Sequence, residues 1–257
     1  MAEEKRSFLD RMLSSIQPGL VEGYRPQPQQ LAEGLWAIER KLKMPGGFTL
    51  PVRTTVVRLQ SGALVVLSPP KLDADFKGWL RQQGEVAAVM ASNVFHYLFV
   101  SEYPPVFPSA RIFVAPGLPR RVPALVTATE LENAPPELWA AEIQQAVFGP
   151  VGNFSEVVFF HRPTETLILT DLAFNLTTFD SLLERVAWRL FGVPSRFGPS
   201  RTARLTLLRD KRAAGEYLRP VREWPFRRIV VSHGIVLENN AQAEFRRAFA
   251  KYLGATS

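Results

Sequence analysis

The chain contains no cysteine in 257 residues, which excludes disulfide bonds, thiolate metal ligands and cysteine nucleophiles. Histidine is also scarce, with three residues in total, so few imidazoles are available for catalysis or metal binding. No apolar run approaches the roughly 18 to 20 residues of a transmembrane helix, and the charged N-terminus lacks the apolar core of a secretion signal. We therefore expect a cytoplasmic protein without a transmembrane segment.

Several catalytic motifs are missing as well. The sequence has no G-x-x-x-x-G-K-[ST] phosphate loop and no G-x-G-x-x-G after a strand, and Ser232-His233-Gly234 is not a nucleophile elbow. These absences argue against a nucleotide-binding enzyme and against a serine hydrolase. The sequence leaves the substrate and the oligomeric state open.

The positive charge is concentrated in one segment. The formal net charge is +7, but Arg185 to Arg228 holds 12 Lys or Arg and 3 acids, so the rest of the chain is slightly acidic. Leucine, phenylalanine and tryptophan are interleaved with these arginines. This mixture suits an anionic partner, either nucleic acid or a membrane surface, although charge runs are usually a solvated surface, here a helical one with a few core anchors.

The apolar patterns predict strands in both halves of the chain, with helices between them. Residues 1–30 are expected to form a short helix and then a surface arm, and residues 31–257 a single domain. We expect one helix at Asp73 to Gln83, helical structure from His96 until Pro104 and Pro105 end it, and a basic helical insert at about 179–224. The predicted strands are Leu35–Ile38, Thr54–Leu59, Ala63–Leu67, Val86–Ser92, Arg111–Val114, Ile143–Phe148, Glu156–Phe160, Leu167–Thr170 and Ile229–Ser232. This order predicts an α/β sandwich in which two mixed sheets lie beneath outer helices.

Three possible metal ligands follow predicted strands. His96 comes after the strand that ends at Ser92, Asp171 ends the run from Thr166 to Thr170, and His233 closes the run that begins at Arg228. His161 lies at a predicted hairpin turn and is interpreted as a structural or surface residue rather than a ligand.

From about Leu31 onward, the order of elements resembles the metallo-β-lactamase superfamily, whose αββα sandwich holds one or two metal ions at strand ends. Val157 to Asp171 resembles the strand pair that leads to the metal-bridging aspartate of that family. Ile229 to Gly234 resembles the late strand that ends in the last ligand histidine of the family. Both segments carry the resemblance.

Other landmarks depart from the family pattern. In the loop His-x-His-x-Asp-His, a gapless alignment places Asn93, Phe95, Tyr97 and Leu98 at the ligand positions. A shift of two residues instead places His96 on the final histidine, Asn93 on the second histidine and Phe95 on the aspartate. The residues around Ser68 replace the early aspartate of the family, and Asn153 replaces its third landmark histidine. Both registers abolish one half of a two-metal site.

In the shifted register, the resemblance implies that His96, Asp171 and His233 hold one divalent ion, zinc, iron or manganese, with open coordination positions. Such an ion would lower the pKa of bound water to near 7, so a divergent metal-dependent hydrolase is the leading hypothesis. Asn93, Tyr97 and Asn153 are predicted to line the pocket and contact a small-molecule ligand. The alternatives are a metal-free site in which the three residues are structural, a non-catalytic protein that binds a ligand through Asn93 and Asn153, and an anionic-surface binder that acts through the basic segment.

Overall fold

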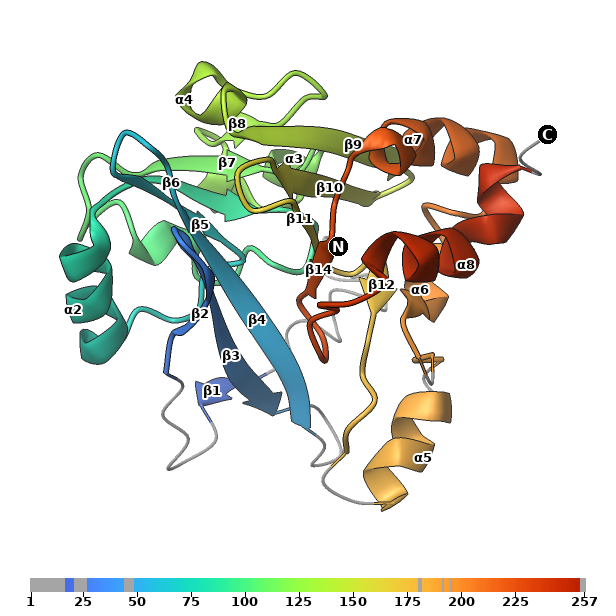
Figure 1. The fold of residues 1–257 in the computed structure, drawn as a ribbon. Coiled ribbons are helices and arrows are strands. Elements are labelled where there is room, and N and C mark those ends of the chain that lie inside the picture. Colours follow the sequence, from blue (N-terminus) through green and yellow to red (C-terminus); the bar gives the residue numbers. More distant parts are fainter. Residues whose placement is uncertain are drawn as a thin grey trace, which may run out of the picture.

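Two sheets face each other in the computed structural model (Figure 1), which describes residues 17–20, 27–43, 49–179, 182–190, 192–194 and 196–254. The larger sheet has the order β1-β3-β4-β5-β6-β7-β8, with β2 also paired to β3. Its pairs from β1 to β5 are antiparallel, and β5 to β8 run parallel. Its strands are β1 Gln17–Leu20, β2 Gln29–Ala32, β3 Leu35–Lys43, β4 Thr49–Arg58, β5 Ala63–Leu67, β6 Glu85–Ala91, β7 Arg111–Val114 and β8 Thr129–Glu130.

The second sheet has the order β14-β11-β10-β9 and is also mixed, because β11 and β14 are parallel and the other pairs are antiparallel. Its strands are β9 Ile143–Val151, β10 Phe154–His161, β11 Thr166–Leu169 and β14 Arg228–Val231. A short pair, β12 Ala173–Phe174 and β13 Gly198–Pro199, lies beside it.

Helices cover the outer faces. The α-helices are α2 Ala74–Gln83, α3 Leu118–Arg121, α4 Glu137–Ala140, α5 Leu182–Leu190, α6 Arg201–Leu205, α7 Lys211–Glu223 and α8 Ala241–Leu253, and 3-10 turns are η1 Val100–Glu102 and η2 Pro123–Leu125. In Figure 1, α2 lies on the outer side of the larger sheet, whereas α7 and α8 lie on the outer side of the smaller one. None of the described helices is long and apolar enough to cross a membrane.

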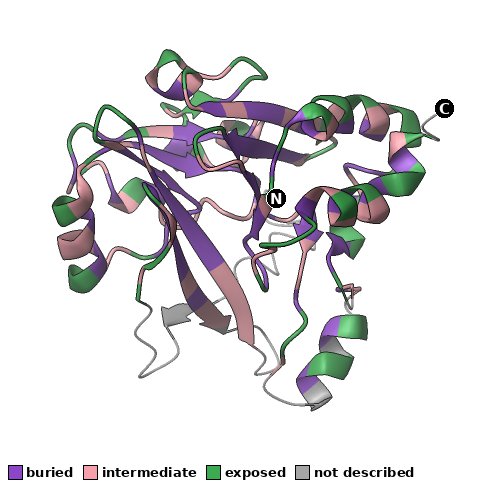
Figure 2. Ribbon diagram, viewed as in Figure 1, coloured by how far each residue is buried: buried purple, intermediate pink, exposed green. Residues whose placement is uncertain are grey.

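Alternating side chains of the strands build the layers. In β5, Val65 faces the core between the sheets while Val66 packs beneath α2. In β10, Phe159 faces that same inner core while Phe160 packs beneath α7 and α8. Because a strand projects successive side chains to opposite faces, strands that are apolar throughout must be covered on both sides. Figure 2 shows the buried strands between outer helices that each expose one side. The predicted αββα sandwich of two mixed sheets is confirmed.

Three segments differ from the local structure expected or lie partly outside the described residues. The helix predicted from His96 up to Pro104 is wrong, because the segment forms turns and only the short η1. The short helix predicted at the start of the chain lies outside the described residues, but β1 and β2, in the predicted arm, pair with β3 and extend the sheet. In the predicted insert, Ala203 of α6 and Leu218 of α7 belong to the core of the smaller sheet, so both helices are part of its outer layer.

Candidate metal centre

Three strand ends meet at one edge of the sandwich. β11 and β14 are parallel neighbours with Leu169 opposite Val231, so the residues after both strands emerge side by side. The segment after β6 joins them from the other sheet, because Ser92 Oγ donates a hydrogen bond to Thr170 Oγ1 over 3.3 Å. The three candidate ligands therefore lie on adjacent segments that the sheet topology brings together.

His96, Asp171 and His233 offer ligand atoms that all lie within 4.8 Å of one another. His233 Nε2 is 2.9 Å from Asp171 Oδ1, and His96 Nε2 is 3.5 Å from Asp171 Oδ2. Ligand atoms of a tetrahedral zinc site are about 3.3 Å apart, given zinc–ligand distances near 2.0 to 2.1 Å. The three side chains thus form a slightly open version of such a site. Among the described residues, no other group of three or more His, Cys, Asp or Glu is arranged to hold a metal ion.

The His233 ring is fixed by its surroundings. Its Nδ1 is 2.7 Å from the carbonyl oxygen of Pro51, which can only accept, so Nδ1 carries a hydrogen and Nε2 points at Asp171. The Phe174 ring packs 4.5 Å from the imidazole, and His233 is 3% exposed. Metal-binding histidines are oriented in this way, with the second ring nitrogen held by a carbonyl or carboxylate. The surroundings of His233 therefore fit a metal ligand.

Asp171 is negatively charged in this setting. Burial by itself raises the pKa of this carboxyl, but the nearby His96 and the hydrogen bond from His233 hold it well below its usual range. Ser200, the N-cap of α6, donates to the Asp171 carbonyl over 2.9 Å and ties the basic segment to the site. An ionised, partly exposed carboxylate between two imidazoles is a hard oxygen donor for a divalent ion.

Asn93 positions the other residues. Its Nδ2 donates to Asp171 Oδ2 over 2.7 Å and to Thr170 Oγ1 over 3.1 Å. Its Oδ1 accepts the backbone N–H groups of Phe95 and His96 at 2.8 and 3.0 Å. These four bonds use the whole hydrogen-bonding capacity of the amide. Asn93 therefore shapes the turn that carries His96 and holds Asp171 beside it.

Glu156 is a site residue that the sequence reasoning missed. It is 1% exposed, and its two carboxylate oxygens accept the backbone N–H groups of Thr170 and Asp171 at 2.9 and 3.0 Å. Burial and the charge of Asp171 raise its pKa to about 7, against the lowering effect of hydrogen bonds from Leu172 and Thr170. A single carboxylate near the start of an otherwise apolar strand was the signal in the sequence. Glu156 fixes the backbone of the residue that carries the central carboxylate.

Glu156→Gln is expected to weaken Zn²⁺ binding about 10- to 100-fold, the usual effect of losing a group that orients a ligand. The amide has one acceptor oxygen for two N–H donors, so one bond to the Asp171 segment is lost. Glu142→Gln is the matched control, because the Glu142 carboxylate likewise accepts a backbone N–H, that of Gln60, but at an exposed position. Competition against a zinc-binding dye gives both affinities. Equal affinities of the two variants would remove Glu156 from the site.

The remaining candidates have other contacts. Asn153 is exposed in the hairpin between β9 and β10, where its carbonyl accepts from Arg121 over 3.4 Å. Tyr97 packs against the core beneath α2. Among the described residues, no hydrogen bond joins either side chain to His96, Asp171 or His233. Their predicted contact with a ligand stays a prediction. His161 is buried, bonded to Thr164 Oγ1 over 2.8 Å, and belongs to the hairpin between β10 and β11.

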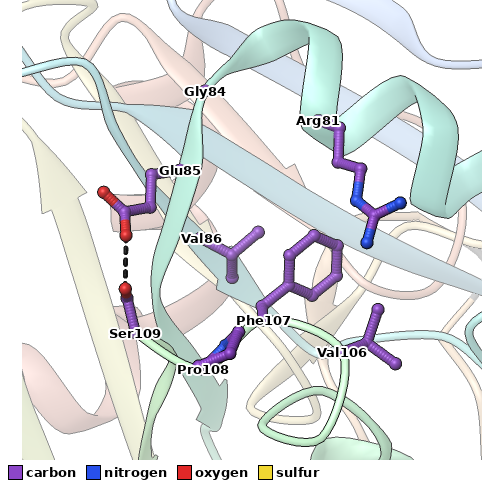
Figure 3. Close-up of a pocket in the computed structure, with 8 residues that line it drawn as sticks. All are labelled: Arg81, Gly84, Glu85, Val86, Val106, Phe107, Pro108 and Ser109. Atoms are coloured by element: carbon purple, nitrogen blue, oxygen red, sulfur yellow. Dashed lines mark hydrogen bonds between the residues drawn. The ribbon is translucent and has the colours of Figure 1, made fainter.

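A surface pocket of about 350 Å³ lies at the opposite end of β6 (Figure 3). Arg81 stands over the Phe107 ring at 5.9 Å, and Ser109 donates to Glu85. Since Glu85 begins β6 and His96 follows its end, this pocket is separate from the candidate metal centre.

Comparison with known proteins now places the chain. A family model described as "Domain of unknown function (DUF4336)" matches residues 32–181, more than half of the chain. The chain belongs to the DUF4336 family. No curated protein matches it.

Solved structures resemble this DUF4336 member in fold. The metallo-β-lactamase DIM-1 exposed to ceftazidime is 14% identical, with a TM-score of 0.60 over 90% of this chain and 99% of that one. The metallo-β-lactamase FIM-1 from Pseudomonas aeruginosa, in its mono-zinc form, is 11% identical, with a TM-score of 0.59 over 90% and 94%. A metal-soaked Flv1 flavodiiron core from Synechocystis sp. PCC6803 is 11% identical, with a TM-score of 0.59, and the match covers 89% of this chain and 60% of that one. The chain therefore has a metallo-β-lactamase-like fold, as its sequence predicted.

Proposed function

We propose that this DUF4336 member is a mononuclear metal-dependent hydrolase. The observation that carries the proposal is the convergence of His96, Asp171 and His233, whose ligand atoms lie within 4.8 Å of one another at three strand ends. Two imidazole nitrogens and one carboxylate suit zinc, iron or manganese, and three protein ligands leave positions open for water and substrate. A divalent ion held there would supply the Lewis acidity that activates water near neutral pH and polarises a substrate oxygen.

The side chains of the protein have distinct tasks in this proposal. His96 and His233 bind through Nε2, and Asp171 binds through a carboxylate oxygen. Pro51 and Glu156 keep His233 and Asp171 oriented, the first through its carbonyl and the second through its carboxylate. A pre-oriented ligand set loses little freedom on binding, which favours affinity.

A single ion is favoured over a pair. The second histidine position of the family loop is Asn93, whose amide is fully used by protein partners, and its aspartate position is Phe95. Neither offers a further ligand. The mono-zinc form of FIM-1 shows that a protein of this fold can hold one zinc ion, which supports the proposal for this chain.

The test begins with untagged protein purified without chelator. We expect close to one equivalent of zinc, iron or manganese, and metal-dependent turnover of one class among chromogenic esters, amides, thioesters and phosphodiesters. His96→Ala is expected to lower kcat/KM at least about 100-fold, because the ion loses a direct ligand. His161→Asn is the matched control, since it changes the one histidine outside the site. Bound metal without turnover of any class would favour the alternative predicted from the sequence, a non-catalytic binding protein.

A further inference from the structure

Helix α5 presents a face that is both basic and apolar. Arg185, Val186, Arg189 and Leu190 are all exposed, with Val186 47% and Leu190 75% accessible. Positions four apart lie on the same side of a helix, so the pairs 185/189 and 186/190 form two adjacent stripes of one face. Trp188 is turned the other way and buried with Leu176 and Val193. Figure 1 shows α5 projecting beyond both sheets, so this face is not covered by the described chain.

Helix α6 continues the same surface. The Arg201 side chain packs directly over Gly192, two residues beyond α5, where an added β-carbon would lie 2.5 Å from Arg201 Cβ. Arg204 Nη2 donates to the carbonyl of Gly192 over 3.4 Å. Leu205, at the end of α6, is 62% exposed. We call the surface formed by Arg185, Val186, Arg189, Leu190, Arg201 and Leu205 the arginine–leucine face.

The charge of this face is not neutralised within the described part of the chain. Nearby carboxylates are engaged elsewhere, because Glu184 accepts from Thr49 at the start of β4 and Asp210 caps α7. Among the described residues, no carboxylate lies within ion-pair distance of Arg185, Arg189 or Arg201. Within the described part of the chain, these three arginines therefore lie beside exposed leucine and valine side chains without an opposing charge.

We propose that the arginine–leucine face docks the protein on a bilayer that contains anionic phospholipid. Arginine is attracted to the negative headgroups, while exposed leucine and valine gain free energy by entering the acyl boundary. A helix that lies in the interface combines these residue types on one face. Nucleic acid fits the face less well, because a phosphate backbone rewards the arginines and leaves Val186, Leu190 and Leu205 exposed to water.

The candidate metal centre is linked to α5 through buried side chains. Trp188 of α5 belongs to a cluster that also packs against Leu50 and Phe174, and the Phe174 ring contacts His233. The candidate metal centre is therefore connected to the inner side of α5, opposite the face that docks. The docking proposal stands independently of metal binding.

Sedimentation with vesicles tests the proposal on the full chain. Protein is mixed either with vesicles of phosphatidylcholine alone or with phosphatidylcholine vesicles that contain about 30% phosphatidylserine. Both mixtures are at about 0.15 M salt. We expect binding to the anionic vesicles only. Arg185→Glu/Arg189→Glu is expected to lower the partition coefficient at least about tenfold, since each basic residue near the surface contributes about 1 kcal/mol. Lys71→Glu/Arg81→Glu, at two exposed positions before and within α2, makes the same charge change and is expected to bind as the natural chain does.

Leu190→Ser separates a membrane from other anions. We expect it to weaken vesicle binding about fivefold or more, because the leucine side chain that enters the acyl boundary on docking is replaced by a hydroxyl group. Absence of binding to anionic vesicles would overturn the proposal, and so would binding that the Arg185/Arg189 variant retains. Tight binding of a duplex DNA probe that Leu190→Ser leaves unchanged, together with no vesicle binding, would assign the face to nucleic acid instead.

Discussion

Asp171→Asn is expected to lower the affinity for Zn²⁺ at least about 100-fold, equivalent to roughly 2.7 kcal/mol. Asp171 supplies the one negative charge between His96 and His233, and it is within 2.9 Å of His233 Nε2. The amide oxygen of asparagine is a neutral and weaker ligand. Its NH₂ group also faces either the Asn93 Nδ2 donor or the Nε2 of His233, neither of which pairs with it as with a carboxylate oxygen. The two imidazoles therefore lose their common partner. Calorimetric titration of the metal-free proteins gives the affinities.

Asp210→Asn is the matched control for this experiment. Asp210 caps α7 by accepting the backbone N–H groups of Arg212 and Ala213, and asparagine caps a helix nearly as well. The control should therefore keep both its stability and its zinc affinity. Circular dichroism reports whether Asp171→Asn is folded. An unchanged zinc affinity of folded Asp171→Asn would show that Asp171 is not a ligand.

Acidification is expected to destabilise the fold through His161. Burial lowers the pKa of His161 to about 4 from an ordinary value near 6.5. The unfolded chain therefore binds more protons than the folded one between these values, so stability is complete above about pH 6.5 and is lost as the pH falls toward 4. The expected contribution of this residue is on the order of 3 kcal/mol between pH 7.5 and pH 4.

Urea unfolding of the natural chain and of His161→Asn at pH 4, 5, 6 and 7.5 measures this effect. Asparagine does not titrate, and its amide can bond Thr164 as the Nδ1 of His161 does. The difference in unfolding free energy between the two proteins should shift in favour of the variant as the pH falls. A difference that is constant across this range would mean that His161 is not the source of the acid sensitivity.

Much of the fold could be predicted because its strands are apolar on both faces. The segments that end at Leu67, Phe160 and Val231 are continuous buried runs, and such runs require covering layers on both sides. The helix expected from His96 up to Pro104 does not form, for a local reason. Asn93 Oδ1 accepts the N–H groups of Phe95 and His96 and closes a turn there, and Tyr103 is buried with its hydroxyl donating to the Pro70 carbonyl.

The site was predicted in part. The predicted strand ends indicated that His96, Asp171 and His233 are candidate ligands. They did not indicate which groups orient these three side chains. Pro51 lies 182 positions from His233 in the chain, and only the packed structure shows that its carbonyl holds the ring. Glu156 was concealed inside a predicted strand, where a charged residue has no local signature of its partners. Asn93 was interpreted as lining a pocket, whereas its bond to Asp171 depends on contact between segments that follow strands of the two sheets.

Anomalous X-ray diffraction from crystals grown with Zn²⁺ tests the central claim most directly. The account predicts one strong peak at the zinc edge, about 2.0 to 2.2 Å from the Nε2 atoms of His96 and His233 and from a carboxylate oxygen of Asp171. The peak should be missing from crystals of Asp171→Asn grown in the same way. A peak at another position, or none at the three residues under saturating zinc, would contradict the assignment of this cluster as a metal centre.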